Sequence, residues 1–142
     1  MIDALAENIA VLEKANLFVT FALIGLIWTI QLVHYPSFHF VAESKFTQFE
    51  KLHTRRIGIV VAPLMLTEIL VSAALALASG FSLKYAVCLG IVVLIWLCTY
   101  FLSVPCHKKL AEGKDIQVIR RLVSTNWPRT LLWSAKGVII LA

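Results

Sequence analysis

The chain has 142 residues, of which 60% are hydrophobic and 15% charged, and its mean hydropathy is +0.86. Soluble domains are typically about 45–50% apolar and about 25% charged, so this composition excludes an ordinary soluble protein and indicates an integral membrane protein. The net charge of +5 comes without a basic soluble domain, which argues against nucleic-acid binding and leaves the lipid bilayer as the expected partner.

Four apolar stretches predict an all-α fold with four membrane spans, at about residues 16–35, 57–79, 84–105 and 122–142. About 20 helical residues are needed to cross about 30 Å of hydrocarbon. The first three stretches meet this requirement, whereas the fourth contains Arg129 and Lys136 and crosses only if its first turns lie among the headgroups. We therefore expect residues 1–142 to form a single domain, an integral membrane four-helix up-down bundle.

The first span ends in His-Tyr-Pro, and Pro36 is expected to end or kink the helix because proline has no backbone N–H to donate. The segment from Ser44 to Arg56 is amphipathic, and Thr47 and Glu50 have the spacing of a capping box. We expect it to lie in the headgroup plane as an interfacial helix that leads into the second span. Its apolar side is assigned to Phe46, Phe49 and Leu52.

The third loop has a similar design. Gly113 and Asp115 mark a helix stop and a helix start before a second amphipathic stripe. Loops 1 and 3 are therefore both expected to carry interfacial amphipathic segments. The stripe in loop 3 consists of Ile116, Ile119, Leu122 and Val123.

Lysine and arginine concentrate in the same two loops. Loop 1 has four of them and loop 3 has six, whereas Lys14 and Lys84 lie on the opposite side. Because short loops rich in Lys and Arg stay in the cytoplasm, we expect loops 1 and 3 to be cytoplasmic. Both termini then lie on the non-cytoplasmic side.

Polar residues gather at this cytoplasmic end. On the last helix, Asn126, Arg129 and Lys136 share one side, since they are spaced at i, i+3 and i+10. All four histidines lie at span ends in the same layer, so the sequence predicts a polar pocket there. These histidines are His34, His39, His53 and His107.

Glu68 and Lys136 are expected to form an ion pair inside the bundle. Lys136 lies about 10 Å deeper than Arg129, and Glu68 lies about 18 Å beyond Arg56. The flexible lysine stem covers much of the difference in depth. Polar groups within hydrocarbon almost always face the bundle interior, which favours this pairing.

The polar layer allows several interpretations. A metal ion held by His34, His39, His53 and His107 is one, although no HExxH or CxxC motif is present. Haem between His34 and either His53 or His107 is another. The alternative without a cofactor is that the histidines hydrogen-bond lipid headgroups while the arginines extend to the lipid phosphates.

A bound anionic or quinone-like ligand is the remaining interpretation. Arg56, Asn126, Trp127 and Arg129 would hold its polar head while its apolar body lies between helices. Histidine is the side chain best suited to move a proton near neutral pH. The candidate catalytic residues are therefore His34, His53 and His107.

The order of these motifs resembles small four-helix bacterial membrane proteins of unknown function, themselves distantly similar to the anthrone-oxygenase-like membrane family. The resemblance implies the four-helix fold, a bacterial inner-membrane location and, by analogy, cofactor-free oxygenation of a hydrophobic aromatic compound. It rests on His34-Tyr35-Pro36, Arg55-Arg56, the run Val104 to Leu110, and Asn126-Trp127 with Arg129.

Two functions follow from these patterns. The first is a ligand-binding or accessory subunit that packs against a larger membrane complex or forms a homo-oligomer, which the small size and the lack of a catalytic signature favour. The second is a membrane-embedded oxidoreductase or oxygenase acting on a hydrophobic or quinone-like small molecule. In that case Asn126 and Arg129 would orient the substrate.

Overall fold

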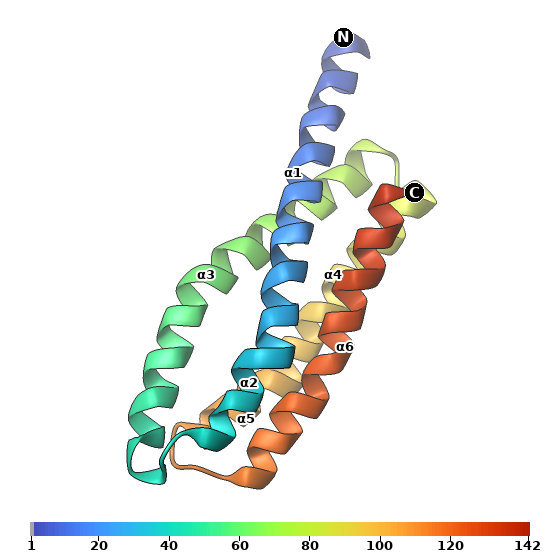
Figure 1. The fold of residues 1–142 in the computed structure, drawn as a ribbon. Helices are drawn as coiled ribbons and strands as arrows, with labels where there is room; N and C mark the ends of the chain where they lie inside the picture. Colours follow the sequence, from blue (N-terminus) through green and yellow to red (C-terminus); the bar gives the residue numbers. More distant parts are fainter. Residues whose placement is uncertain (1) are drawn as a thin grey trace.

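The computed structural model describes residues 2–142, with side chains from Asn8 onward, and this part of the chain is helical without strands. The predicted all-α class is confirmed. The chain forms four long helical rods joined by short connections (Figure 1). The first rod consists of α1 (Ile2–Thr29), η1 (Ile30–His34), α2 (Tyr35–Ser37) and η2 (Phe38–Phe40), and the second is α3 (Glu43–Ala78). The third consists of α4 (Leu83–Cys98), η3 (Thr99–Ser103) and α5 (Val104–Leu110), and the fourth is α6 (Ile116–Leu141).

Three of the rods are long and apolar enough to cross a membrane. They cover Asn8–Phe40, Glu43–Ala78 and Leu83–Leu110. The first and third exceed the predicted spans at both ends, whereas the second begins earlier than predicted and ends within one residue of the predicted end. α6 does not meet the same criterion by composition, because it carries polar residues along much of its length. The three apolar helices identify a membrane protein.

The rods pack as a ring in which each has two main neighbours. α1 contacts α3 and α6, and α4 contacts the same two helices (Figure 1). One buried apolar cluster lies at mid-length and another at the end where α5 and the start of α6 meet. Trp133 is the largest fully buried side chain of the mid-length cluster, and Phe38 and Phe46 are the largest fully buried side chains of the other.

Two prolines are accommodated by wide helical turns. Of the two outcomes predicted for Pro36, an end or a kink, the end does not occur, because helix continues beyond Pro36 to Phe40. A five-residue π-helical turn precedes Pro36, and another precedes Pro105 in the third rod. A π turn changes the local hydrogen-bond pattern, so it can absorb a residue that lacks an N–H. Such turns also re-aim the side chains near them, and here these include Tyr35 and His107.

The amphipathic segments predicted for loops 1 and 3 are the opening turns of long helices. α3 begins at Glu43, four residues before Thr47, so the capping-box interpretation is wrong. Leu52 is 51% exposed, because Glu50 and His53, not Leu52, share the buried side of α3 with Phe46. The start at Asp115 is confirmed: its carboxylate accepts hydrogen bonds from the backbone N–H groups of Gln117 and Val118.

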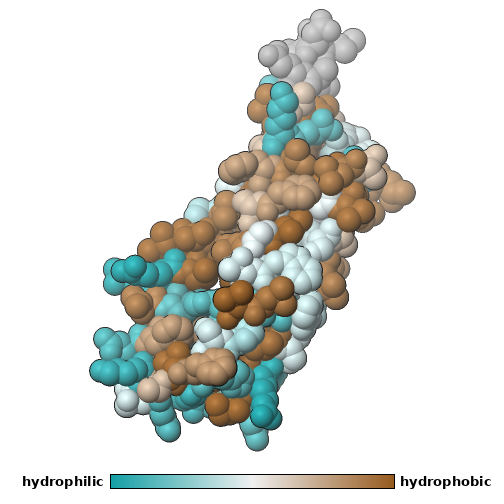
Figure 2. All heavy atoms as spheres, in the orientation of Figure 1, coloured by the Kyte–Doolittle hydropathy of each residue, from teal (hydrophilic) through white to brown (hydrophobic). Residues whose placement is uncertain are grey.

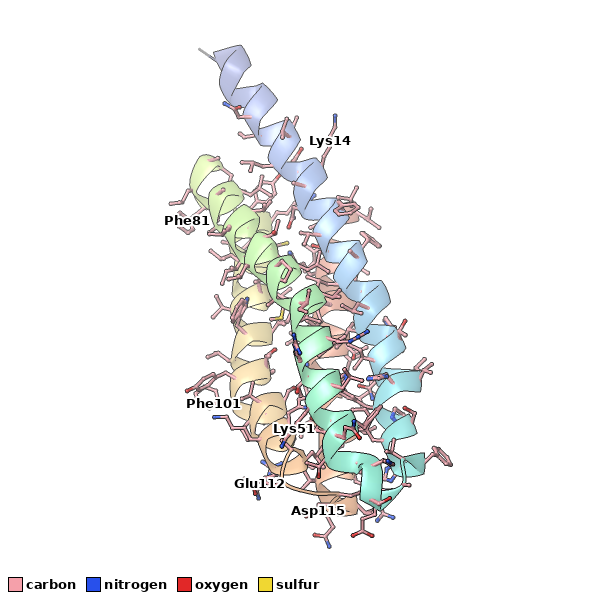
Figure 3. The ribbon with its side chains drawn as sticks, turned by 90° about the vertical axis from the view of Figure 1, so that its left-hand side faces the viewer. Lys14, Lys51, Phe81, Phe101, Glu112 and Asp115 are labelled. Carbon is pink, nitrogen blue, oxygen red and sulfur yellow. The ribbon has the colours of Figure 1, made fainter. Side chains whose placement is uncertain are left out.

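Exposed charged side chains lie at the two ends of the bundle and not along its middle. Figure 3 shows Lys14 near one end, Lys51, Glu112 and Asp115 at the other, and Phe101 projecting outward between them. Figure 2 shows the same distribution on one face, with hydrophilic residues concentrated at the end where α3 begins. This end is called the basic end below. Its exposed cations are Lys45, Lys51, Arg55, Arg56, Lys108, Lys109, Arg120 and Arg121.

α1 and α6 approach each other closely at Gly137, which is buried. A Cβ atom added there would lie 2.6 Å from Cδ1 of Ile24. Small residues permit such contacts between membrane helices, where close packing replaces the hydrophobic drive of soluble proteins.

Candidate functional site

Three histidines and a buried glutamate gather inside the basic end. Glu50 and His53 lie one helical turn apart on α3, His34 ends the first π turn, and His107 belongs to α5. Glu50 is fully buried and His53 is 7% exposed. The sequence signal for this arrangement was the spacing of Phe46, Glu50 and His53 at i, i+4 and i+7, which places them on one helix face.

Glu50, His107 and Tyr35 form a continuous chain of hydrogen bonds. His107 Nδ1 lies 2.6 Å from Glu50 Oε1, and His107 Nε2 lies 3.1 Å from the Tyr35 hydroxyl. An ionised carboxylate only accepts, so Nδ1 then carries the proton. Nε2 accepts the O–H of Tyr35 when the ring is neutral and donates to the hydroxyl oxygen when the ring is an imidazolium. The carboxylate thus selects the tautomer of His107. Tyr35 was not among the predicted site residues, and its position beside His34 in HYP gave no independent signal.

His34 and His53 bind each other. His34 Nε2 and His53 Nδ1 are 2.7 Å apart, which is a direct hydrogen bond. The rings also pack against Phe38 in edge-to-face geometry. At this separation there is no room for a haem iron or another metal ion between the two nitrogens.

The predicted four-histidine metal site does not assemble. Among the described residues, no group of three or more His, Cys, Asp or Glu side chains is arranged to hold a metal ion. His39 lies on the last 3-10 turn of the first rod, and its backbone carbonyl accepts a hydrogen bond from Lys114. Haem cannot be held between His34 and His53, because their facing nitrogens are only 2.7 Å apart.

Arg129 and Asn126 form a second polar group beside these residues. The Arg129 guanidinium donates to Ser103 Oγ at 3.2 Å and to Asn126 Oδ1 at 3.0 Å. Asn126 in turn donates to Gln31 Oε1 at 2.8 Å. Arg129 is 5% exposed and also stacks on the ring of Trp133. Its Nε has no hydrogen-bond partner.

A cavity of about 530 Å³ opens beside this group, between α3 on one side and α4, η3 and α5 on the other. Its walls are mainly apolar, from residues such as Ile57, Val61 and Trp96. Its polar lining includes Arg129 and both Tyr35 and His107. The indole N–H of Trp96, like Arg129 Nε, is buried without a partner. The size and the few polar groups are those of a small-molecule site.

Deeper in the bundle, the structure brings Glu68 and Lys136 together. Lys136 Nζ lies 2.8 Å from Glu68 Oε1, and both side chains are fully buried. Trp133 donates its indole N–H to the other carboxylate oxygen at 2.9 Å. The remaining acceptors of the lysine are Asn16 and Thr20, each at 3.0 Å, and Ser72 at 3.2 Å.

Three of the four predicted ligand-binding residues do not line the cavity. Asn126 is one of them, although it is buried and accepts a hydrogen bond from Arg129, which does line it. Arg56 is exposed at the basic end and does not line it, and Trp127 is 38% exposed and packs edge-to-face on Trp28. The charge of Arg56 gave no information about helix phase, whereas the inward phase of Arg129 was readable from its spacing. Gln31, Tyr35, Trp96 and Ser103 also belong to the site and were not among the predicted site residues. The spacing of Gln31 with His34, and of Ser103 with Thr99, indicates an inward direction for both.

No protein-family model, curated protein or solved structure matches this chain. Function is therefore inferred from the geometry of the site.

Proposed function

We propose that this protein is a four-span, up-down membrane bundle that binds an amphipathic small molecule in the cavity beside Arg129. The polar head of the ligand lies against Arg129 and Trp96, and its apolar body lies along α3 and α4. The observation that carries the proposal is the mainly apolar cavity of about 530 Å³ whose lining includes the buried guanidinium of Arg129 and the indole of Trp96, each with an N–H that has no partner.

The burial pattern of α6 supports a fourth span. Between residues 126 and 142, both charged side chains, Arg129 and Lys136, are buried, and every exposed residue is apolar. A hydropathy average over the sequence counts the buried charges and so underestimates how apolar the outer surface is. The exposed residues are Trp127, Pro128, Leu131, Ala135, Val138, Leu141 and Ala142.

The charge distribution supports a cytoplasmic location for the basic end. Loops rich in Lys and Arg are retained in the cytoplasm, and the cations of this end far outnumber those at the other. In this orientation the opening turns of α3 and α6 lie at the interface with the headgroups. Cysteine labelling in sealed vesicles tests the topology: Lys14→Cys and Lys84→Cys should react from one side, and Lys51→Cys and Glu112→Cys from the other. Labelling of all four from one side would contradict it.

The unpartnered donors favour a binding function over a purely structural one. Buried N–H groups in native proteins nearly always have partners, and an unsatisfied one costs about 1–3 kcal/mol. If the polar cluster served only as internal structure, the protein would be more stable with these N–H groups hydrogen-bonded. Glu68 and Lys136, by contrast, are embedded in a complete set of partners.

The chemistry of the donors defines the class of ligand. A guanidinium N–H and an indole N–H both require an acceptor, such as a carbonyl, phenolic or carboxylate oxygen. Lys108 also lines the cavity and adds positive charge. The apolar walls fit a ring system or an alkyl chain, so the expected ligand is an aromatic or lipid-like molecule with an oxygen-bearing head.

Binding can be measured with 6-bromo-2-naphthol, whose bromine quenches tryptophan fluorescence on contact. With the protein in lipid nanodiscs, we expect saturable quenching that Trp96→Phe largely removes. Ala62→Phe should weaken binding by filling the cavity, because Ala62 is part of its wall. Leu66→Phe is the matched control, since Leu66 is 50% exposed on the same helix and does not line the cavity.

The role of the guanidinium is tested by Arg129→Met against Arg120→Met. Arg120 is exposed at the basic end of the same helix and does not line the cavity. Loss of a charge-assisted hydrogen bond of about 1.5–3 kcal/mol should weaken binding about 10- to 100-fold in Arg129→Met. Quenching that stays linear with probe concentration, or equal weakening in both variants, would refute the proposal.

A further inference from the structure

The chain Glu50, His107 and Tyr35 ends at the same cavity that holds Arg129, and the binding proposal does not use it. These three side chains come from α3, α5 and α2, so only the tertiary fold brings them together. We propose that they form a proton relay that makes the cavity a site for reversible proton abstraction next to the carbonyl group of a bound apolar ketone. This inference rests on the binding function proposed above.

The order in which hydrogen bonds connect the three groups supports proton transfer. With Glu50 ionised, it accepts from Nδ1 of His107, and Nε2 is left to accept from the Tyr35 hydroxyl. When the Tyr35 proton moves to Nε2, the ring becomes a cation that the buried carboxylate, 2.6 Å away, stabilises. The resulting Tyr35 phenolate is a base at the wall of the cavity.

The cavity also supplies a group for the negative charge that then develops. The Tyr35 phenolate removes a proton from the ligand carbon beside the carbonyl, and the electron pair of the C–H bond moves to the carbonyl oxygen. Arg129 lines the same cavity, and its positive charge stabilises that enolate. Return of a proton to the carbon from Tyr35, and of the His107 proton to Tyr35, restores the starting state, so no oxidant, reductant or co-reactant is consumed.

Exchange with water has a route through His107. Its side chain is 17% exposed, whereas that of Glu50 is fully buried. While the enolate is held, the imidazolium can release its Nε2 proton to solvent and take up the proton that Tyr35 removed from the ligand. A deuteron from heavy water then reaches Tyr35 by the same route, and Tyr35 delivers it to the ligand carbon. In heavy water, each turnover then introduces deuterium beside the ligand carbonyl.

2-Tetralone is a suitable probe, because it combines an aromatic body with a ketone and acidic C–H groups. Its deuterium uptake in heavy water can be followed by NMR with the protein in nanodiscs, against empty nanodiscs. General acid–base catalysis typically contributes about 10²–10⁴-fold, so Tyr35→Phe should lower the protein-dependent rate at least about 10²-fold. Tyr100→Phe is the matched control, since Tyr100 is exposed and lies outside the cavity.

Glu50 acts through His107 and is a positioning residue. Glu50→Gln keeps the size of the side chain but removes the charge that stabilises the imidazolium. It should lower kcat for exchange at least about tenfold with little change in KM, and Glu50→Asp should restore part of the loss. Circular dichroism and quenching by 6-bromo-2-naphthol will show whether each variant is folded and binds.

The outcomes separate the two proposals. Bound probe without protein-dependent exchange, or equal exchange in wild type and Tyr35→Phe, would overturn the relay and leave the binding function standing. Absence of saturable binding to the wild-type protein would overturn both. Exchange that is lost in Tyr35→Phe but not in Tyr100→Phe, with probe binding kept in both, supports the relay.

Discussion

The buried pair of Glu68 and Lys136 makes a prediction whose size can be worked out from the structure. Removing one partner of a buried ion pair leaves an uncompensated charge and typically costs about 3–5 kcal/mol. In Glu68→Gln the ammonium keeps only neutral acceptors, and in Lys136→Met the carboxylate keeps only the N–H of Trp133 and the hydroxyl of Thr20. We expect each single change to lower the free energy of unfolding by about 3 kcal/mol.

The double variant Glu68→Gln/Lys136→Met should be destabilised less than either single variant, because it contains no buried charge. If each single change costs about 3 kcal/mol, the coupling energy is then at least about 3 kcal/mol. Neutral hydrogen bonds inside membrane proteins average about 0.6 and reach about 1.7 kcal/mol, so a coupling above that range requires the charges.

The assay is equilibrium unfolding in mixed micelles with increasing sodium dodecyl sulfate, followed by circular dichroism and tryptophan fluorescence. Glu112→Gln and Lys109→Met, separately and together, are the control cycle, since both residues are exposed at the basic end. Additivity of the Glu68 and Lys136 changes within about 0.5 kcal/mol would refute the idea that the two act as a charged pair.

Three further predictions concern packing, capping and thiol access. Gly137→Val should cost about 1–3 kcal/mol, because a side chain there meets Ile24 of α1; unchanged unfolding would mean that the two helices do not approach as described. Asp115→Ala should lower stability by about 1 kcal/mol through loss of the N-cap, and Asp115→Asn should recover most of it; equal losses would point away from capping. Cys88 and Cys106 are buried and should resist N-ethylmaleimide in the folded protein, as measured by mass spectrometry, but react after unfolding; rapid labelling of either when folded would contradict the burial found here.

Much of the architecture could be predicted from the sequence because hydrocarbon imposes a simple rule on composition. A segment that crosses it must be helical and apolar for about 20 residues, so the three apolar helices could be located from residue type alone. The start of α6 could also be predicted, because Asp115 caps the helix by accepting hydrogen bonds from the backbone N–H groups of Gln117 and Val118, which are close to it in sequence. The shared inward phase of Asn126, Arg129 and Lys136 followed from helical periodicity.

Other features depended on how the helices pack, which composition does not encode. Local propensity predicts that a proline breaks or kinks a helix, but here the helices continue past Pro36 and Pro105, each of which follows a π turn. The helix phase of α3 decides that Glu50 is buried while Arg56, six residues later, is exposed.

The sequence by itself determined that this is a helical membrane protein with its polar chemistry at the basic end. Only the tertiary structure decided which polar groups meet. Two residues at the same depth along the bundle are neighbours only if their helices lie side by side. The order of the helices around the ring depends on packing across all four helices. It separates His39 from the other three histidines, pairs His34 with His53, and links Glu50 through His107 to Tyr35 at the cavity.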